Sequence, residues 1–290
     1  MRTGFAVGTL VGVLLLSSLP ASGQTDIADN LPLETFTEEA PDPGLVASEA
    51  FGPPPNADPA LHDFAGTLTI ELGLMTQDNV TALAGSGTFP GLSAEFFVHE
   101  GWLVPVERDI IQSSCCWDLI LSPGRVWSDP DDGGWSRAGF PFVLINTGFP
   151  EAHNGLATFL YGEDAVSSVR IQVTAETAPE REFDARALLP AAYQPSPVGD
   201  DVREAFASEL AARLPVRLMT ELSEHVGRDL ETEIIGNIPP EEVSALAVLA
   251  DGVIYQGRSA IRTGNHPYPE SIRSSVYSMS KSMGGGLSAL

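Results

Sequence analysis

The sequence predicts a mixed fold, in which an N-terminal antiparallel β-sandwich of jelly-roll type is followed by the first elements of an α/β domain. Three observations lead to this prediction. Seven short β-like runs lie between residues 67 and 173, and turns rich in Gly, Asp, Asn and Pro separate them, as is typical of antiparallel sandwiches. After residue 200 the apolar residues recur at helical spacing. Two apolar runs joined by Asp251-Gly252 then predict a β-hairpin.

Residues 1–23 have the pattern of a secretory signal peptide. Arg2 provides a positive charge, residues 5–19 are apolar, and Ala21-Ser22-Gly23 offers the small residues that a signal peptidase reads. An uncleaved N-terminal anchor is the alternative, although the apolar run is shorter than the ~20 residues that cross a membrane. We therefore expect a periplasmic or secreted protein whose mature chain contains no membrane span.

Composition divides the following residues into a lead-in, a β-rich domain and a linker. Residues 24–62 are rich in Pro, Asp, Glu and Ala and are expected to be mostly unstructured. Residues 63–177 form the predicted sandwich, and residues 178–199, which contain four prolines, are expected to link it to the next domain. The predicted strands are 67–72, 93–98, 102–106, 117–121, 140–145, 156–161 and 166–173.

Residues 200–290 are expected to form the start of the second domain, first as helices and then as the hairpin. The first helix fits a capping box at Asp201 and Glu204, followed by apolar residues on one face. A second amphipathic run, 218–226, ends at Gly227, which is a common residue at the C-terminal end of a helix.

The charge of the chain limits its partners. It contains 39 acidic residues and 15 basic ones, which gives a formal net charge of -24. Such a surface repels nucleic acid and anionic lipid, so we expect neither as a partner. The acidity itself is typical of a soluble exported protein and does not indicate a cationic substrate.

The two cysteines, Cys115 and Cys116, are adjacent in the sequence. They cannot crosslink distant parts of the fold, so a reduced pair and a strained vicinal disulfide both stay open. The five histidines are scattered and do not combine with the cysteines into a zinc-ligand spacing. We therefore expect neither a metal nor a cofactor.

Three further features have a structural and a functional interpretation. All four tryptophans lie between Trp102 and Trp135, where they are either core anchors or a platform for a carbohydrate. His99-Glu100 lacks the second histidine of a zincin helix, and residues 129–132 lack the terminal glutamate of a calcium loop. The structural interpretation is favoured for all three.

The last fourteen residues contain Ser278 and Lys281 in a Ser-x-x-Lys pattern. On a helix that begins near Ser278, Lys281 lies one turn later on the same face. A serine hydroxyl becomes a nucleophile when a neighbouring base takes its proton, and a lysine with a lowered pKa can do this. Backbone amides at the helix N-terminus would stabilise the oxyanion. The pattern predicts covalent catalysis with Ser278 as the nucleophile and Lys281 as its base.

Lys281 is the only lysine of the chain, and the other fourteen basic side chains are arginines. Arginine cannot be deprotonated in a protein and so cannot act as a base. The single lysine therefore stands at the position where arginine could not serve. This favours a catalytic residue over an incidental surface lysine.

Residues 245–258, a connecting stretch and the run 276–282 together resemble the opening of the class C β-lactamase, or penicillin-binding-protein-like, superfamily of serine hydrolases. This superfamily includes penicillin-binding carboxypeptidases, β-lactamase-related esterases and nylon-oligomer hydrolases. The resemblance covers residues 240–290, with the helical run from about 200 as an extension. It implies a helix, a hairpin and a helix with Ser-x-x-Lys, in which Ser278 is acylated by an amide or ester and Lys281 is the base or proton shuttle.

The later elements of this superfamily have no counterpart in the sequence. The family needs a Tyr-x-Asn motif and a Lys-Thr-Gly-like strand after the nucleophile, but only nine residues follow Lys281. We therefore expect an N-terminal fragment that is inactive by itself. The alternative is a secreted β-sandwich protein with a binding or structural role and a non-catalytic hydrolase remnant. The substrate stays open, because the family determines it in the missing region.

Overall fold

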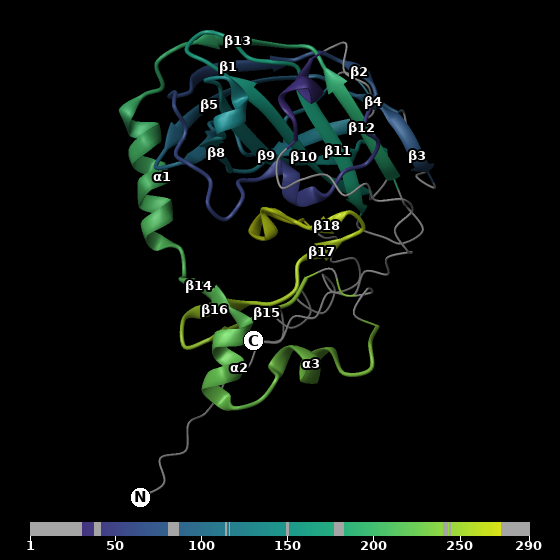
Figure 1. Ribbon diagram of the computed structural model, residues 1–290, viewed down its shortest axis with the longest axis vertical. Coiled ribbons are helices and arrows are strands. Elements are labelled where there is room, and N and C mark those ends of the chain that lie inside the picture. Colours follow the sequence, from purple (N-terminus) through teal and green to yellow (C-terminus); the bar gives the residue numbers. More distant parts are fainter. Residues whose placement is uncertain are drawn as a thin grey trace, which may run out of the picture.

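The computed structural model describes residues 31–37, 42–80, 87–113, 115, 117–148, 151–176, 183–239, 243 and 245–273. The predicted signal peptide and both predicted catalytic residues lie outside these ranges. Figure 1 shows a large curled β-sheet and, beside it, a smaller group of helices and strands. No helix in the described ranges is long and apolar enough to cross a membrane.

Eleven antiparallel strands form one sheet, which curls into a half-barrel (Figure 1). Their bounds are β1 Ala65–Ile70, β3 Thr76–Val80, β5 Leu92–His99, β6 Trp102–Pro105, β7 Trp117–Leu121, β8 Gly124–Ser128, β9 Ser136–Asn146, β10 Ala152–Tyr161, β11 Val169–Glu176, β12 Phe183–Leu189 and β13 Ala191–Pro195. The order is β13-β1-β5-β6-β8-β9-β10-β11-β12-β3. β9 pairs with β8 along its first residues and with β7 along its last ones. Two short strands, β2 (Gly73–Leu74) and β4 (Thr88–Phe89), pair with each other.

The prediction of an antiparallel, β-rich domain is confirmed, and each of the seven predicted runs overlaps a strand. β7 shows why the sequence pattern predicted the strands. Trp117, Leu119 and Leu121 are buried, whereas the two residues between them are only partly buried, which is the alternation expected of a β-strand. The sequence pattern missed β3 and β8, because β3 is polar and β8 begins at Gly124, directly after Pro123, where the sequence indicates a turn. Both strands form through pairing with their neighbours, β12 and β9.

The main apolar core lies inside the curl of the sheet. Along β10, Ala157, Phe159 and Tyr161 belong to this inner core, whereas Leu156 and Leu160 pack on the outer face. Trp117 and Trp127 are fully buried, which confirms the structural interpretation for two of the four tryptophans. Stacking of aromatic rings adds specific contacts, such as that between Phe64 and Tyr193, whose ring centroids are 4.1 Å apart.

The outer face of the sheet is covered by the N-terminal segment, which corrects the prediction of an unstructured lead-in over 24–62. Two short 3-10 helices, η1 (Leu33–Phe36) and η2 (Ser48–Phe51), form there. The buried side chains of this segment pack against Leu156 and Leu160 and are Leu31, Phe36, Val46, Ala50 and Phe51. The composition is polar on average, but these spaced apolar residues provide enough contact to order the segment on the sheet.

The predicted linker, 178–199, is also corrected, because it contains β12 and β13. Only Pro190 separates these strands in the chain, yet they lie near opposite ends of the sheet order. The curl therefore brings the two ends of the sheet together at Pro190, whose carbonyl accepts a hydrogen bond from Glu71 N at 3.0 Å. Prolines fit here because they lie between strands and at the end of the edge strand β13, where no amide donor is needed.

Helix α1, Asp200–Ala212, confirms the first predicted helix and packs on the outer side of β5 and β6. Phe206 is buried there against Phe97 and Val104. The predicted capping box is wrong in detail: Gly199 occupies the N-cap position and no side chain caps the helix. Packing of Phe206 and two acidic residues in the first turn stabilise the helix instead.

A smaller unit follows α1. It consists of β14 (Val216–Leu218), α2 (Met219–Val226), α3 (Leu230–Ile235), β15 (Ala247–Ala250) and β16 (Val253–Gln256), with strand order β14-β16-β15. The predicted helix end at Gly227 and the predicted hairpin are confirmed. Asp251 and Gly252 have φ values of 50° and 76°, as a two-residue hairpin turn requires.

The chain then returns to the large sheet. Residues 260–273 form the short hairpin β17 (Ala260–Ile261) and β18 (Gly264–Asn265) and the 3-10 helix η6 (Pro269–Ser271), which lie between the smaller unit and the curled sheet in Figure 1. Tyr268 is buried in the outer cluster of the sheet, and its hydroxyl donates to Phe51 O at 2.9 Å. The two parts of the chain are therefore joined by packing as well as by sequence.

Candidate functional site

Ser278 and Lys281 lie outside the described residues, so the structure does not show whether they meet. It does show the position of Arg273, which precedes them in the sequence. Arg273 N donates to Asn154 Oδ1 at 2.8 Å, and Asn154 Nδ2 donates to Arg273 O at 2.9 Å. Strand β10 thus holds the backbone of a residue five positions before Ser278.

A buried polar cluster fixes the same segment further upstream. Thr263 Oγ1 lies 2.7 Å from Ser48 Oγ and 2.9 Å from Thr174 Oγ1, and Arg262 forms an ion pair with Asp184. Buried polar groups with partners of this kind specify one arrangement of the chain. Residues 260–273 are therefore positioned on the sheet by hydrogen bonds from three different parts of the fold.

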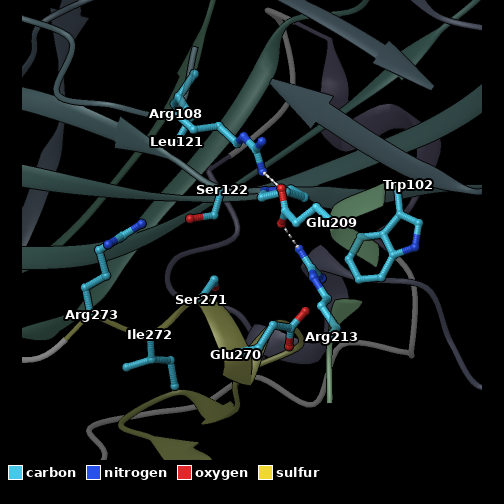
Figure 2. A pocket seen from close by; sticks show the side chains of 11 residues that line it. Trp102, Arg108, Leu121, Ser122, Glu209, Arg213, Glu270, Ser271, Ile272 and Arg273 are labelled. Atoms are coloured by element: carbon cyan, nitrogen blue, oxygen red, sulfur yellow. Dashed lines mark hydrogen bonds and ion pairs between the residues drawn. The ribbon is translucent and has the colours of Figure 1, made fainter. Parts of the chain in front are cut away.

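The pocket that this segment helps to form has a volume of about 340 Å³. Figure 2 shows its side chains, which come from distant parts of the sequence. The lining residues are Trp102, Arg108, Leu121, Ser122, Pro123, Glu209, Arg213, Glu270, Ser271, Ile272 and Arg273. β6, the turn between β7 and β8, the end of α1, and η6 with the residues after it thus each form part of the wall.

One wall of the pocket is an ion-pair chain. Glu209 accepts a hydrogen bond from Arg108 Nη1 at 2.5 Å and another from Arg213 Nη2 at 2.7 Å (Figure 2). Burial would raise the pKa of Glu209, but the hydrogen bonds from Arg213 and Arg108 outweigh it, so this pKa lies below its ordinary value. Glu209 is therefore ionised at neutral pH and orients both guanidinium groups.

Aromatic rings contact Arg108 and Arg213, and also Arg125. The Arg125 guanidinium lies 3.3 Å from the centroid of the Trp102 ring, and that of Arg213 lies 5.3 Å from it. Phe206 faces Arg108 and Arg213 at 5.7 and 5.8 Å. Cation–π contacts of this kind fix the planes of the guanidinium groups. Burial lowers the pKa of Arg125, but an arginine stays charged in a protein.

The opposite wall is formed by Arg273, with Ser122 close to it (Figure 2). The Arg273 side chain is exposed, and its guanidinium has no hydrogen bond or ion pair with any residue that the structure describes. Ser122 is 8% exposed, and within the same ranges its hydroxyl is without a partner. Both groups are therefore free to donate hydrogen bonds to a ligand.

A second polar cluster is sealed inside the curl of the sheet. His153 Nε2 lies 2.7 Å from Glu151 Oε1, and Asn146 Nδ2 donates to Glu151 Oε2 at 3.1 Å. Trp117 and Phe183 enclose the imidazole ring. Burial lowers the pKa of His153, although Glu151 acts against it. This cluster has no access for a substrate, since His153 is fully buried.

The two motifs that favoured a structural interpretation have structural partners. The His99 ring packs edge-on against Phe206, and Glu100 has φ 49° in the turn before β6. Asp129 caps the 3-10 helix η3 (Pro130–Asp132), and Asp132 binds Arg137 with both carboxylate oxygens at 2.6 Å. No cluster of three or more metal-ligating side chains occurs in the part of the chain that is described.

Sequence reasoning missed the arginine-lined pocket. Arg108, Arg213 and Arg273 are far apart in the sequence and belong to no motif. The one available signal was the use of arginine in place of lysine. Arginine is the residue of choice for bidentate binding of carboxylates and for stacking on aromatic rings. That signal indicates what kind of group the arginines would bind, but it does not indicate where in the fold they meet.

The chain matches no protein-family model, and it has no significant match among curated proteins or solved structures. The functional argument therefore depends on the chain's own residues.

Proposed function

We propose that the protein is an exported serine hydrolase of the Ser-x-x-Lys type, related to the class C β-lactamases. The observation that supports this most is the order of elements before the motif. Helices α2 and α3 precede the hairpin β15–β16, which turns at Asp251-Gly252, and Ser278 and Lys281 follow later in the sequence. The superfamily has the same order before its nucleophile. The finer fold predictions, a jelly-roll-type sandwich and a β-lactamase-like second domain, are part of this proposal.

In the proposed reaction, Ser278 Oγ attacks the carbonyl carbon of an amide or ester. The neutral amine of Lys281 takes the hydroxyl proton as the bond forms, and the proton then passes to the departing amine or alcohol as the old bond breaks. Water hydrolyses the acyl-enzyme and frees Ser278. No cofactor and no metal are needed for these steps, and the proposed location is the periplasm or the exterior.

The small three-stranded sheet supports the proposal that further elements complete the second domain. Val216 and Leu249 both pair with Ile254 from its two sides, so these three residues form a row across one face. Val216 is 56% exposed and Leu249 43% exposed. The other face packs on α2 and α3. A serine hydrolase of this superfamily would cover the exposed row with its remaining elements, because an apolar face of this kind is stable when it is buried.

A fluorescent penicillin and a fluorophosphonate probe test the proposal on the full-length protein. We expect covalent labelling that is lost in Ser278→Ala and kept in Ser282→Ala, a matched serine in the same motif. Labelling that is equal in both variants would place the nucleophile elsewhere. Absence of labelling with both probes would rule out the acyl-enzyme and favour the alternative below.

The second candidate function is a secreted binding protein whose Ser-x-x-Lys segment has no catalytic role. The arginine-lined pocket favours it, because three of its walls come from the β-rich domain and α1. The two candidates differ in one measurable property: the binding protein holds a ligand reversibly and leaves no adduct.

A further inference from the structure

We propose that the pocket between β6, the end of α1 and residues 270–273 binds the carboxylate of a small monoanionic ligand, with Arg273 as the principal contact. This inference does not depend on acylation at Ser278. It applies equally if the protein is a hydrolase and if it is a binding protein.

The charge of the pocket is opposite to that of the molecule. The chain has a formal net charge of -24, yet three of its fourteen arginines line this pocket, and among the described residues only two carboxylates, Glu209 and Glu270, line it with them. The lining therefore has a surplus of one positive charge. In a strongly acidic protein, such a concentration attracts an anion locally and leaves most other surfaces repulsive to it.

Arg108 and Arg213 are preorganised but are not saturated. Each donates one hydrogen bond to Glu209, and each guanidinium has five N–H donors. The rings of Phe206 and Trp102 restrict their planes. Binding of a ligand would therefore require little ordering of these side chains, which lowers its entropic cost.

Among the arginines of the pocket, Arg273 is the one best placed to bind a ligand. Asn154 fixes its backbone through two hydrogen bonds, while its guanidinium has no ionic partner in the described ranges. Figure 2 shows this side chain extending toward Ser122, whose hydroxyl can donate to the same ligand. A planar guanidinium matches the two oxygens of a carboxylate and binds them in bidentate fashion.

Size and charge favour a small monocarboxylate over a phosphate. A volume of about 340 Å³ is at the lower end of the range for small-molecule sites, about 300–1,000 Å³. Glu270 lies at the pocket wall beside Arg213 (Figure 2). A doubly charged phosphate would be repelled more strongly by Glu209 and Glu270 than a single carboxylate.

The test uses N-acetylglycine as the monocarboxylate probe, N-acetylglycinamide as its neutral counterpart, and inorganic phosphate. Binding is measured by isothermal titration calorimetry on the 290-residue chain with Ser278→Ala, so that no acylation contributes. We expect N-acetylglycine to bind and the neutral amide to give no heat. Phosphate is expected to bind at least threefold more weakly than N-acetylglycine.

Arg273→Gln, added to this background, should weaken N-acetylglycine binding about tenfold or more, the effect of losing hydrogen bonds to a charged group. The matched control is Arg217→Gln, which removes an exposed arginine on β14, outside the pocket, and should leave binding unchanged. Arg273→Lys keeps the positive charge but removes the planar guanidinium, so it should give an intermediate loss of N-acetylglycine binding.

Three results would overturn the inference: equal binding of the charged and neutral probes, equal binding by the two arginine variants, or no binding of N-acetylglycine. Phosphate binding as strong as that of N-acetylglycine would refute the preference for a carboxylate. The absence of N-acetylglycine binding would not change the result of covalent labelling at Ser278. The two experiments therefore test this inference and the hydrolase proposal independently.

Discussion

Asn154 on β10 holds Arg273 by both of its backbone groups, with hydrogen bonds of 2.8 and 2.9 Å. The asparagine is 5% exposed, and its two hydrogen bonds to Arg273 are partly buried, where they are worth more than at the surface. The same contact positions Arg273, which lines the pocket and lies five residues before Ser278 in the sequence. It therefore connects the β-rich domain with the proposed catalytic segment.

Asn154→Ala should lower the free energy of unfolding by about 1–3 kcal/mol, because it leaves two backbone groups of Arg273 without their partners. Urea unfolding followed by circular dichroism measures the effect. Asn237→Ala is the control, since Asn237 is exposed after α3, and it should change stability by less than about 0.5 kcal/mol. Equal effects of the two variants would show that the contact does not stabilise the fold.

The buried ion pair between Asp132 and Arg137 predicts a larger effect. Both side chains are at most 2% exposed, and two hydrogen bonds of 2.6 Å join them. Asp132→Ala should destabilise the protein by about 3–5 kcal/mol, because it leaves a buried charge without its partner.

Substitution of both partners tests the reason for this loss. Asp132→Ala combined with Arg137→Met removes the stranded charge and should restore part of the stability lost by Asp132→Ala alone. The thermal unfolding midpoint compares the parent, Asp132→Ala, Arg137→Met and the double variant. A double variant that is as unstable as the two single losses combined would contradict the explanation.

His266 predicts a loss of stability in acid. Burial lowers its pKa to about 4, whereas the unfolded chain has the ordinary value near 6.5. Between these values the unfolded state binds a proton that the folded state does not, so stability is complete above about pH 6.5 and falls as the pH decreases toward 4. At pH 5 the loss from this group should be about 2 kcal/mol.

The variant His266→Asn isolates this effect, because an asparagine oxygen can still accept the hydrogen bond that Tyr268 N donates to His266 Nδ1 at 3.1 Å. Between pH 7.5 and pH 5, the unfolding free energy of the parent should fall by about 2 kcal/mol more than that of the variant. Parallel pH profiles would show that the pKa of His266 is the same in the folded and unfolded states, and would contradict this prediction.

Local signals in the sequence predicted local structure well, and interactions between distant residues account for what was missed. Asp251-Gly252 specifies its hairpin through backbone conformation alone, and the alternation in β7 is visible within five residues. By contrast, Leu31 and Phe36 are ordered by contact with β10, more than a hundred residues away. Prolines indicated a linker, but Pro190 lies where the two ends of the sheet meet.

The difference between local signals and contacts between distant residues also explains which candidate site the sequence could indicate and which it could not. Ser278 and Lys281 form a local motif, so the sequence alone could name them. The pocket depends on Arg108 and Glu209, which are 101 residues apart and meet because α1 packs beside β6. No spacing in the sequence indicates that contact before the fold is known.

Mass spectrometric mapping of a fluorophosphonate adduct on the protein tests the central claim most directly. Trypsin cleaves after Arg273 and Lys281, so Ser278 is released in the peptide 274–281, whose fragment ions distinguish its four serines. The proposed mechanism predicts one adduct, on Ser278, and its loss when Lys281 is replaced by methionine. An adduct on a different serine, or an unmodified protein after prolonged exposure to the probe, would contradict the assignment of Ser278 as the nucleophile.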